Sequence, residues 1–257
     1  MCGRYRLSRR KQIIEERFDA IPEPADDEAD TWSPRYNIAP TQPVPVVRQR
    51  PSQSPPNQSR PNQPRRELSV MRWGLIPSWA TDPSIGSKTI NARAETVTTT
   101  ASFRDAFRSQ RCLIPADGFY EWPRKEWPGK EWLKNSKQPF CFEVADGELF
   151  AFAGLWDQWT DPQGKAVETC TILTTTPNAL LADFHDRMPV ILRPDDYNRW
   201  LSPQPGDTAA ALRLLVPYAG AMRRYPVSTR VNHVKNDDPD CATPVELEEP
   251  AQGQLFG

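Results

Sequence analysis

The chain has 257 residues and carries 32 Lys and Arg against 33 Asp and Glu, so its formal net charge is −1. This balance argues against a histone-like or tail-driven nucleic-acid binder. No apolar run approaches the roughly 20 residues of a membrane helix, and the N-terminus lacks the apolar core of a signal peptide. We therefore expect a cytoplasmic protein that does not associate with membranes.

The first predicted elements, in chain order, are a short helix and a hairpin. Ser8 can cap an amphipathic helix that ends at Phe18. Strand-like runs at 44–48 and 68–73 flank an insertion, 51–66, that is rich in proline and has almost no apolar residue. Such a segment buries too little apolar surface to become ordered. We therefore predict one hairpin with a disordered insertion in its loop.

The later elements follow one another less regularly. Ser102 and Asp105 open a short helix, and a polar hairpin loop is expected over 123–138. The β-like runs lie at 111–116, 139–145, 149–155, 168–175 and 188–192. Further helical segments are expected after Pro177, Pro194 and Asp207. Because strands and helices do not alternate, we predict an α+β fold, a single domain rich in antiparallel strands with short flanking helices.

Composition sets three further expectations. Proline accounts for 28 of the 257 residues, about twice the usual share, which disfavours long helices and a closed, regular barrel. We expect one domain over 1–240 and an acidic C-terminal tail, 241–257, with fraying from residue 236 onward. Residues 1–20 carry a net charge of +3 and residues 48–108 one of +6. The near-neutral total can therefore hide a basic face.

Cysteine and histidine content limits the kinds of site. The five cysteines are an odd number without a Cys-x-x-Cys pair, and there are two histidines. A disulfide framework, a zinc knuckle and a His-rich metal site are therefore not expected, and no cofactor is implied. Cys112, Cys141 and Cys170 fall on apolar alternating runs and are interpreted as inert core residues.

Cys2 is the residue with the most distinctive chemistry. If Met1 is removed, Cys2 becomes an N-terminal 1,2-aminothiol, and an α-amine has a pKa of about 7.7–8.0. Such an amine can attack an aldehyde to give a Schiff base, and the adjacent thiol can then close a five-membered thiazolidine ring. The following Gly3 and Arg4 allow a tight turn with a cation beside the thiol. The alternative is an incidental cysteine at a disordered terminus.

Three internal motifs carry further candidate groups. In NARAET, Asn91 can hold an amine or polarise a carbonyl, and the Asn, Arg and Glu of this motif share one face in a strand. In ADGFYEW, Glu121 is flanked by aromatic residues, which can raise a carboxyl pKa and suit it to proton transfer. In FHDRMP, His185 is a candidate general acid or base. The plain alternatives are a turn network, a surface glutamate at a strand end and a structural histidine. His233, in a polar loop, is interpreted as structural.

Seven short motifs occur in a fixed order along the chain. They are MCGRY at 1–5, RYNIAPTQ at 35–42, RWGLIPSWA at 72–80, NARAET at 91–96, ADGFYEW at 116–122, FHDRMPVIL at 184–192 and PVSTRVNHVKND at 226–237. Together they resemble the SOS-response-associated peptidase (SRAP) family of abasic-site-processing proteins. The resemblance covers about residues 1–240.

This resemblance implies an activity. Members remove their own Met1 and then crosslink covalently, through a thiazolidine, to the ring-opened aldehyde of an abasic site in single-stranded DNA. The chain would then be a Cys-dependent autopeptidase with a lyase-type crosslinking activity in the DNA damage response. It would act as a monomer that joins the nucleoid when it binds DNA.

The resemblance also implies roles for particular residues. By motif, Cys2 is the nucleophile and Asn91 orients its amine. Proton transfer falls to Glu121 and His185. The positions that match DNA-contacting or neighbouring active-site residues are Arg4, Pro40, Trp79, Arg93, Thr174 and Arg187.

One position departs from the family pattern. Members often have an aromatic residue directly after the position of Trp79, whereas this chain has Ala80. An aromatic or large apolar residue at the DNA surface can wedge against the bases. The candidates for that wedge in this chain are therefore Trp79 itself and Ile85.

Two other functions stay open from the sequence. The first is a cysteine peptidase that uses Cys2, Glu121 and His185 to cleave other proteins, and it would cleave added peptides. The second is a non-catalytic reader of single-stranded or modified DNA in which Cys2 is incidental. A Cys2→Ala chain would then bind and function normally.

Overall fold

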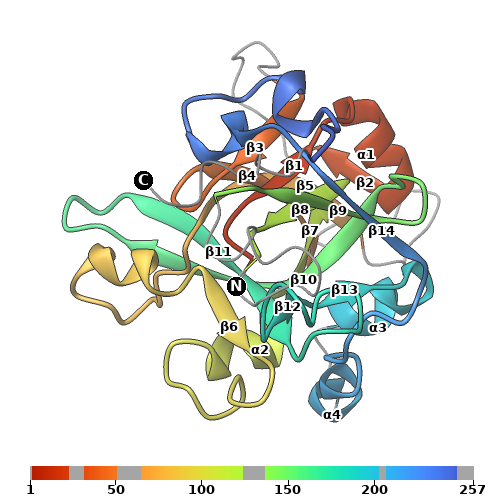
Figure 1. Cartoon of the computed structure of the whole chain (residues 1–257). Coiled ribbons are helices and arrows are strands. Elements are labelled where there is room, and N and C mark those ends of the chain that lie inside the picture. The colour runs from red at the N-terminus through yellow and green to blue at the C-terminus, as the bar shows by residue number, and fades with distance from the viewer. Residues whose placement is uncertain (1, 23–31, 51–64, 124–136, 203–206, 248–257) are drawn as a thin grey trace.

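The computed structural model describes residues 2–22, 32–50, 65–123, 137–202 and 207–247. Within these ranges the chain forms two β-sheets with short helices at their margins (Figure 1). The fold is the α+β architecture, rich in antiparallel strands, that the sequence predicts. Its arrangement matters for function because the two sheets carry different parts of the candidate site.

The smaller sheet has five strands, each antiparallel to its neighbours. In spatial order they are β14 (Met222–Pro226), β9 (Phe140–Val144), β8 (Gly118–Glu121), β1 (Tyr5–Leu7) and β3 (Arg35–Ile38). Strand β1 lies inside this sheet, with Tyr5 opposite Phe119 on one side and Ile38 on the other. Backbone hydrogen bonds to two neighbours therefore fix the N-terminal strand.

The larger sheet closes on itself. Its main strands, in spatial order, are β12 (Met188–Pro189), β11 (Ala166–Thr175), β10 (Phe150–Thr160), β7 (Arg111–Ala116), β4 (Pro43–Arg50), β5 (Arg65–Trp73) and β2 (Ala20–Pro22). Strand β11 also pairs in parallel with β5, at Cys170 and Trp73, so β5, β4, β7, β10 and β11 form a closed ring. Two short strands complete the sheet: β6 (Asn91–Arg93) beside β11 and β13 (Ile191–Leu192) beside β10.

The closed ring shows that one of the two expectations drawn from the proline content was wrong, namely that a closed barrel is disfavoured. Pro43 and Pro45 lie at the start of β4, where the described pairing of this strand is with β5 alone. Strand β7 joins β4 at Val47 and Arg48. The missing proline N–H groups therefore cost no ladder hydrogen bond on the side of β7. The predicted hairpin of β4 and β5 is present.

The helices are short, as predicted, but two of their expected features are absent. They are α1 (Lys11–Phe18), α2 (Arg104–Ser109), α3 (Tyr197–Leu201), α4 (Asp207–Leu212) and the 3-10 turns η1 (Pro83–Ser87), η3 (Pro194–Asp196), η4 (Thr229–Asn232) and η5 (Pro239–Ala242). Ser8 does not cap α1, because its N–H and Oγ both donate to Oδ2 of Asp117 at 2.7 Å. The helix expected after Pro177 is replaced by turns at 179–184.

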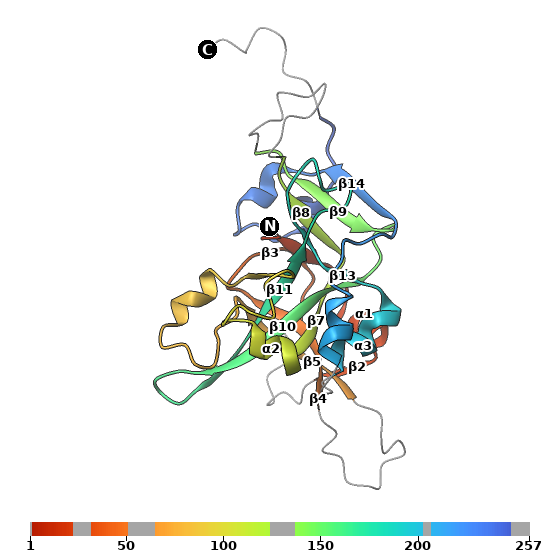
Figure 2. The ribbon, with the colours of Figure 1, turned by 90° about the horizontal axis from the view of Figure 1, so that it is seen from below.

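One hydrophobic core joins the two sheets. The ring of Tyr5 on β1 meets the rings of Trp73 and Phe152 edge-on, with centroids 5.4 and 5.7 Å apart. Cys2 belongs to the same buried cluster. Figure 2 shows β8, β9 and β14 on one side of the molecule and β4, β5 and β7 on the other. Two sheets that share one core form a single domain.

The described part of the C-terminal segment is packed, although we expected it to fray. Cys241 is buried, and the Val245 N–H donates to the carbonyl oxygen of Pro226 at 3.0 Å. The domain boundary at residue 240 stays a prediction.

Two predicted loops lie largely outside the described residues. These are the insertion, of which 51–64 are not described, and the hairpin loop, of which 124–136 are not described. The last two residues assigned to the insertion, Arg65 and Arg66, instead begin β5.

Candidate functional site

Cys2 lies shortly before β1 and is completely buried. Its carbonyl oxygen accepts a hydrogen bond of 2.9 Å from Nδ2 of Asn91. Asn91 begins β6 and lies opposite Ile172 of β11, so the larger sheet presents the amide to the N-terminal segment. The Oδ1 atom of Asn91 is also buried and has no hydrogen-bond partner among the described residues.

Glu121 reaches the same point from the smaller sheet, as the buried last residue of β8. Strand β8 pairs with β1, with Tyr5 opposite Phe119. The same antiparallel register, continued, places Glu121 opposite Gly3 and next to Cys2. Burial raises the pKa of the Cys2 thiol far above its ordinary value, and the negative charge of Glu121 raises it further. The thiol is therefore protonated at neutral pH.

His185 is buried, and its Nδ1 atom has two neighbours of opposite character. The backbone N–H of Arg187 donates to Nδ1 at 3.0 Å, and Oδ1 of Asp186 lies 2.6 Å from the same atom. A deprotonated Nδ1 accepts the first contact, and a protonated Nδ1 donates to the second. Both protonation states of the imidazole ring therefore have a partner at this atom.

Arg187 and Thr174 meet at the end of β11. The Nη2 atom of Arg187 donates to the carbonyl oxygen of Thr174. Glu95 holds the same guanidinium, with Nη1–Oε1 and Nη2–Oε2 distances of 2.8 and 2.9 Å. Sequence reasoning placed Glu95 on the same face as Asn91 and Arg93 but gave it no role. The alternation of Asn, Arg and Glu in NARAET was the one signal in the sequence that could have indicated a role for Glu95.

The other two predicted arginines differ in exposure. Arg93 is exposed at the end of β6, in register with Thr174. Arg4 is half-buried, and its Nη1 donates to Oδ1 of Asn37 at 2.7 Å and to the carbonyl oxygen of Val231 at 2.5 Å. Burial lowers the pKa of Arg4. Its contacts tie it to β3 and to the segment after β14, a different set from the contacts of Arg187.

Trp79 lies on a loop that is hydrogen-bonded to the β10–β11 hairpin. The three bonds are Ile76 N–H to Thr169 Oγ1 (2.8 Å), Ser78 N–H to Asp157 Oδ2 (2.9 Å) and Trp159 Nε1–H to the Ala80 carbonyl oxygen (2.7 Å). Trp79 is the only exposed Trp, Tyr or Phe in the described ranges. Ala80 is buried in a small apolar cluster against which Ile85 packs. A fixed backbone therefore presents the Trp79 ring, whereas Ile85 is engaged in packing.

The base of this loop also positions Pro40. Gly74 has a φ of +126°, and a Cβ there would lie 2.4 Å from the carbonyl oxygen of Gly86, so only glycine fits. The turn that contains Pro40 is bonded to Trp73: Thr41 N–H donates to Trp73 O at 2.8 Å, and Trp73 N–H to Gln42 O at 3.0 Å. Pro40 and the Trp79 loop therefore start from the same end of β5.

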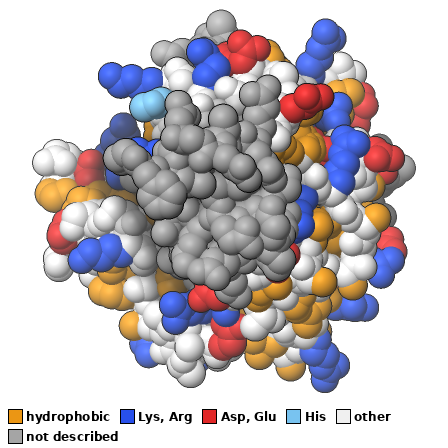
Figure 3. All heavy atoms as spheres, in the orientation of Figure 1, with side chains coloured by type: hydrophobic (Ala, Val, Ile, Leu, Met, Phe, Trp, Pro, Cys, Tyr) orange, Lys and Arg blue, Asp and Glu red, His pale blue; other side chains and the backbone are white. Residues whose placement is uncertain are grey.

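Positive charge is not gathered on the face that Figure 3 shows. Over the described surface of this face, Lys and Arg side chains are interspersed with Asp and Glu. This face does not show the basic patch that the charged segments suggested. The arginines described above are the candidates for phosphate recognition.

Metal sites and membrane spans are absent from the part of the chain that the structure describes. No group of three or more His, Cys, Asp or Glu side chains there is placed to hold a metal ion. No helix there is both long enough and apolar enough to cross a membrane. All five cysteines are buried and free.

A family model described as SOS response associated peptidase (SRAP) matches residues 1–234. The chain belongs to the SRAP family. The abasic site processing protein YoqW of Bacillus subtilis is 41% identical over 244 residues, which cover 93% of this chain and 98% of that protein. The abasic site processing protein HMCES of Xenopus tropicalis is 33% identical over 86% of this chain and 69% of its own length.

Solved structures have the same SRAP-like fold. A crystal structure of a protein from Bacteroides thetaiotaomicron superposes with a TM-score of 0.78 at 25% identity, covering 95% of this chain and all of that one. A second, from Bordetella bronchiseptica, gives a TM-score of 0.67 at 28% identity, covering 88% of this chain and all of that one.

The SRAP motifs form three groups in space. The first joins Cys2 with the side chains of NARAET and ADGFYEW, and the second joins NARAET with β11 and the FHDRMP segment. The third was missed from the sequence: Nδ2 of Asn37 donates to the carbonyl oxygens of Val231, His233 and Asn236. Its only signal was that PVSTRVNHVKND had no assigned role and that RYNIAPTQ, far from it in the sequence, had one at Pro40 alone.

Proposed function

We propose that this SRAP protein processes abasic sites in single-stranded DNA by forming a thiazolidine crosslink through Cys2. The observation that carries the proposal is the meeting of three groups from separate elements. The buried Cys2 has its carbonyl oxygen bonded to the Asn91 amide, and the charge of Glu121 acts on its thiol. The relatives named abasic site processing proteins support it. One chain supplies every group, so we take the active species to be a monomer.

Removal of Met1 is the first step. Hydrolysis of the peptide bond before Cys2 consumes one water and frees the α-amine that the crosslink requires. A buried, protonated thiol is a poor nucleophile, so self-cleavage needs a group that accepts its proton. Glu121 is the carboxylate beside the thiol. We therefore assign Glu121 to the self-cleavage as well as to the crosslinking step.

The crosslink then forms at two atoms of Cys2. The amine attacks the aldehyde carbon, one water leaves as the Schiff base forms, and the thiol adds across the C=N bond to close the thiazolidine. The buried Oδ1 of Asn91 can accept a hydrogen bond from this amine, while Nδ2 holds the Cys2 carbonyl oxygen. The amide would thereby orient the amine toward the aldehyde.

Ring opening of the abasic sugar is the step assigned to His185 and Glu121. It requires a proton at the ring oxygen and removal of a proton from the hydroxyl group on C1, the carbon that becomes the aldehyde. His185 suits proton exchange because each of its protonation states has a partner at Nδ1. Glu121 lies beside Cys2 and supplies the second group that can exchange a proton.

We assign DNA binding to two surfaces beside Cys2, one around Arg187 and one around Trp79. Arg93, Thr174 and Arg187 gather where β6 meets β11, and arginines there can bind phosphates. The exposed Trp79 ring can stack on a base of a single strand, with Pro40 on the adjoining turn. Arg4 keeps three of its five N–H donors beyond the bonds described above, and we assign these to a phosphate.

The test is the intact mass of the full chain before and after mixing with a single-stranded oligonucleotide that carries one abasic site. We expect loss of Met1 before mixing and, after it, the mass of protein plus oligonucleotide minus one water. Cys2→Ala should form no adduct, and neither should an oligonucleotide with every base intact.

Retention of Met1 in an active preparation would contradict the mechanism. Cleavage of added peptides would favour the general peptidase, and normal function of Cys2→Ala the non-catalytic reader.

The acid–base assignments have a separate test in gel-based crosslinking rates. Glu121→Gln should slow Met1 removal and crosslinking together, by the 10²–10⁴-fold typical of general acid–base catalysis. His185→Ala should slow crosslinking less when the aldehyde is supplied already ring-opened. If both variants react within about twofold of the parent, well below that range, the two residues are structural.

A further inference from the structure

The ion pair between Arg187 and Glu95 uses the donors that a phosphate would need. A guanidinium offers two edges from which a pair of N–H donors points the same way: Nη1 with Nη2, and Nε with Nη2. Glu95 occupies the first edge, at 2.8 and 2.9 Å. Nη2 also donates to the carbonyl oxygen of Thr174. Nη2 has one N–H group on each edge, and the two go to Glu95 and to the Thr174 carbonyl oxygen, so Arg187 has no edge left for a bidentate phosphate while Glu95 is bound.

The exposure of the two partners shows which of them can move. The Glu95 side chain is half exposed, whereas the Arg187 side chain is largely covered and stays bonded to Thr174. The carboxylate can therefore turn out into water without uncovering the core. The Nε atom of Arg187 is buried and has no hydrogen-bond partner among the described residues. The bond to Thr174 therefore keeps the guanidinium in place, and its Nη1–Nη2 edge is open to another anion once Glu95 turns away.

Glu95 also lies in the field of two cations. The hydrogen bonds from Arg187 hold the pKa of Glu95 below its usual range, and the charges of Arg187 and Arg93 act in the same direction. Glu95 is therefore ionised at neutral pH. It repels a phosphate at the place where these two arginines attract one.

We infer that Glu95 is a specificity-determining residue that stands in for a DNA phosphate at Arg187. It weakens the non-covalent binding of intact single-stranded DNA. A DNA strand is then retained only when it forms the covalent crosslink. The inference rests on the proposed function, because it takes Arg187 to be a phosphate contact. An intact strand displaces Glu95 and then dissociates, whereas an abasic strand becomes linked to Cys2 before Glu95 returns.

The test is a fluorescence anisotropy titration of the full chain with a labelled single-stranded oligonucleotide without abasic sites, at several salt concentrations. Glu95→Gln keeps the size of the side chain and removes its charge. We expect about two- to fivefold tighter binding, the range of an exposed ion pair. The log–log salt slope should steepen by up to about 0.7, the value of one phosphate on a single strand. In an Arg187→Ala background the same substitution should give no gain.

Glu148→Gln is the matched control. Glu148 is exposed and lies 3.8 Å from Arg17, so its substitution changes the net charge equally but at a different arginine. It should leave the affinity unchanged. An equal gain in both variants would overturn the inference, because net charge alone would then explain it. Weaker binding by Glu95→Gln would also overturn it, since Glu95 would then position Arg187 for DNA.

A competition assay reads out specificity directly. An excess of intact single-stranded DNA should inhibit crosslinking to an abasic oligonucleotide more strongly in Glu95→Gln than in the parent. Equal inhibition would overturn the inference while leaving the proposed function in place. Failure of the parent itself to bind or crosslink single-stranded DNA would overturn the proposed function, and the inference with it.

Discussion

Arg6 and Arg187 are each held by carboxylates, and the two sites differ in the exposure of those carboxylates. The arginine side chains are almost equally covered, at 12% and 13% exposed. Asp117 and Glu143, which hold Arg6, are 0% and 3% exposed, whereas Glu95 is 49% exposed. Removing one enclosed carboxylate leaves a buried arginine with less compensating charge, which is costly. An exposed carboxylate can be exchanged for another anion at small cost.

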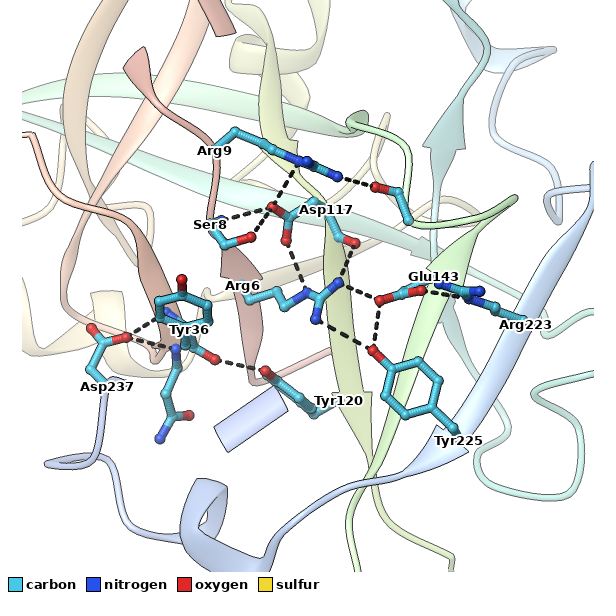
Figure 4. Close-up of polar contacts among 12 residues, drawn as sticks. Arg6, Ser8, Arg9, Tyr36, Asp117, Tyr120, Glu143, Arg223, Tyr225 and Asp237 are labelled. Carbon is cyan, nitrogen blue, oxygen red and sulfur yellow. Dashed lines mark hydrogen bonds and ion pairs between the residues drawn. The ribbon is translucent and has the colours of Figure 1, made fainter. Parts of the chain in front are cut away.

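The Arg6 site ties together strands of the smaller sheet (Figure 4). Asp117, between β7 and β8, lies 3.0 Å from Nε of Arg6 on β1. Glu143 on β9 bonds to Arg6 and accepts a hydrogen bond of 2.6 Å from the hydroxyl of Tyr225 on β14. The strand that follows Cys2 is therefore held by charge as well as by its backbone. An enclosed network therefore holds the strand that follows Cys2, whereas Arg187, the proposed DNA contact, is held by an exchangeable carboxylate.

Asp117→Ala should have the largest effect, because it leaves the buried Arg6 with Glu143 alone and removes the acceptor of both hydrogen bonds from Ser8. We expect the free energy of unfolding to fall by about 3–5 kcal/mol in urea denaturation. Asp183→Ala is the control, since Asp183 is exposed and lies 3.8 Å from Arg224, and its loss should stay below about 1 kcal/mol. Equal losses would show that the network does not hold β1.

Glu143→Gln tests how the stability contributed by the same network depends on pH. Although burial raises the pKa of Glu143, hydrogen bonds from Tyr225 and Arg223 and the charge of Arg6 bring it below the ordinary 4.5. Its ionised form therefore stabilises the fold above about pH 4.5, and this contribution is lost as pH falls through the folded-state pKa. We expect a loss of about 1.5–3 kcal/mol at pH 7, and a smaller difference below pH 4.5. If the loss of unfolding free energy does not change with pH, the packing of the Glu143 side chain rather than its charge explains the loss.

Gly118→Ala should disturb the network sterically. A Cβ at this position would lie 2.8 Å from Nε of Arg6 and 3.1 Å from Sγ of Cys141. We expect the free energy of unfolding to fall by about 1–3 kcal/mol, as for an overpacked core. Adding Cys141→Ala removes one of the two close contacts and should restore part of the loss. Wild-type stability in the single variant would show that Arg6 moves freely.

Glu95→Gln should have the smallest effect on stability. The pair with Arg187 has an exposed partner, so we expect a loss below about 1 kcal/mol at pH 7. The same urea series as for Glu143→Gln provides the comparison. A loss as large as that of Glu143→Gln would remove the distinction between a fixed and an exchangeable carboxylate.

Strands buried on both faces were the parts of the fold that the sequence predicted best. The run at 111–116 coincides with β7, every residue of which is buried, because such strands read as unbroken apolar runs. The closure of the ring could not be predicted in this way. It depends on the pairing of Cys170 with Trp73, and no local pattern specifies a parallel pair so distant in sequence.

The same difference between local and distant signals applies to the candidate site. Cys2, Asn91 and Glu121 each stand out in their own motif, and the structure brings them together. Glu95 was not assigned a role because its partner, Arg187, lies 92 residues further along the chain. A glutamate on a polar strand face is ordinary until the arginine that it holds is known.

The burial of Cys2 also bears on oxidation and on the order in which the bonds form. Oxidants and alkylating reagents attack thiolates, and this thiol is enclosed with a raised pKa. Burial thereby protects the Cys2 thiol, the proposed nucleophile, from peroxides and disulfide exchange. In the proposed mechanism the amine needs no thiolate to attack an aldehyde, so we expect the C–N bond to form first and the C–S bond second. The sulfur then reacts within the same molecule, where a low thiolate fraction is offset by proximity.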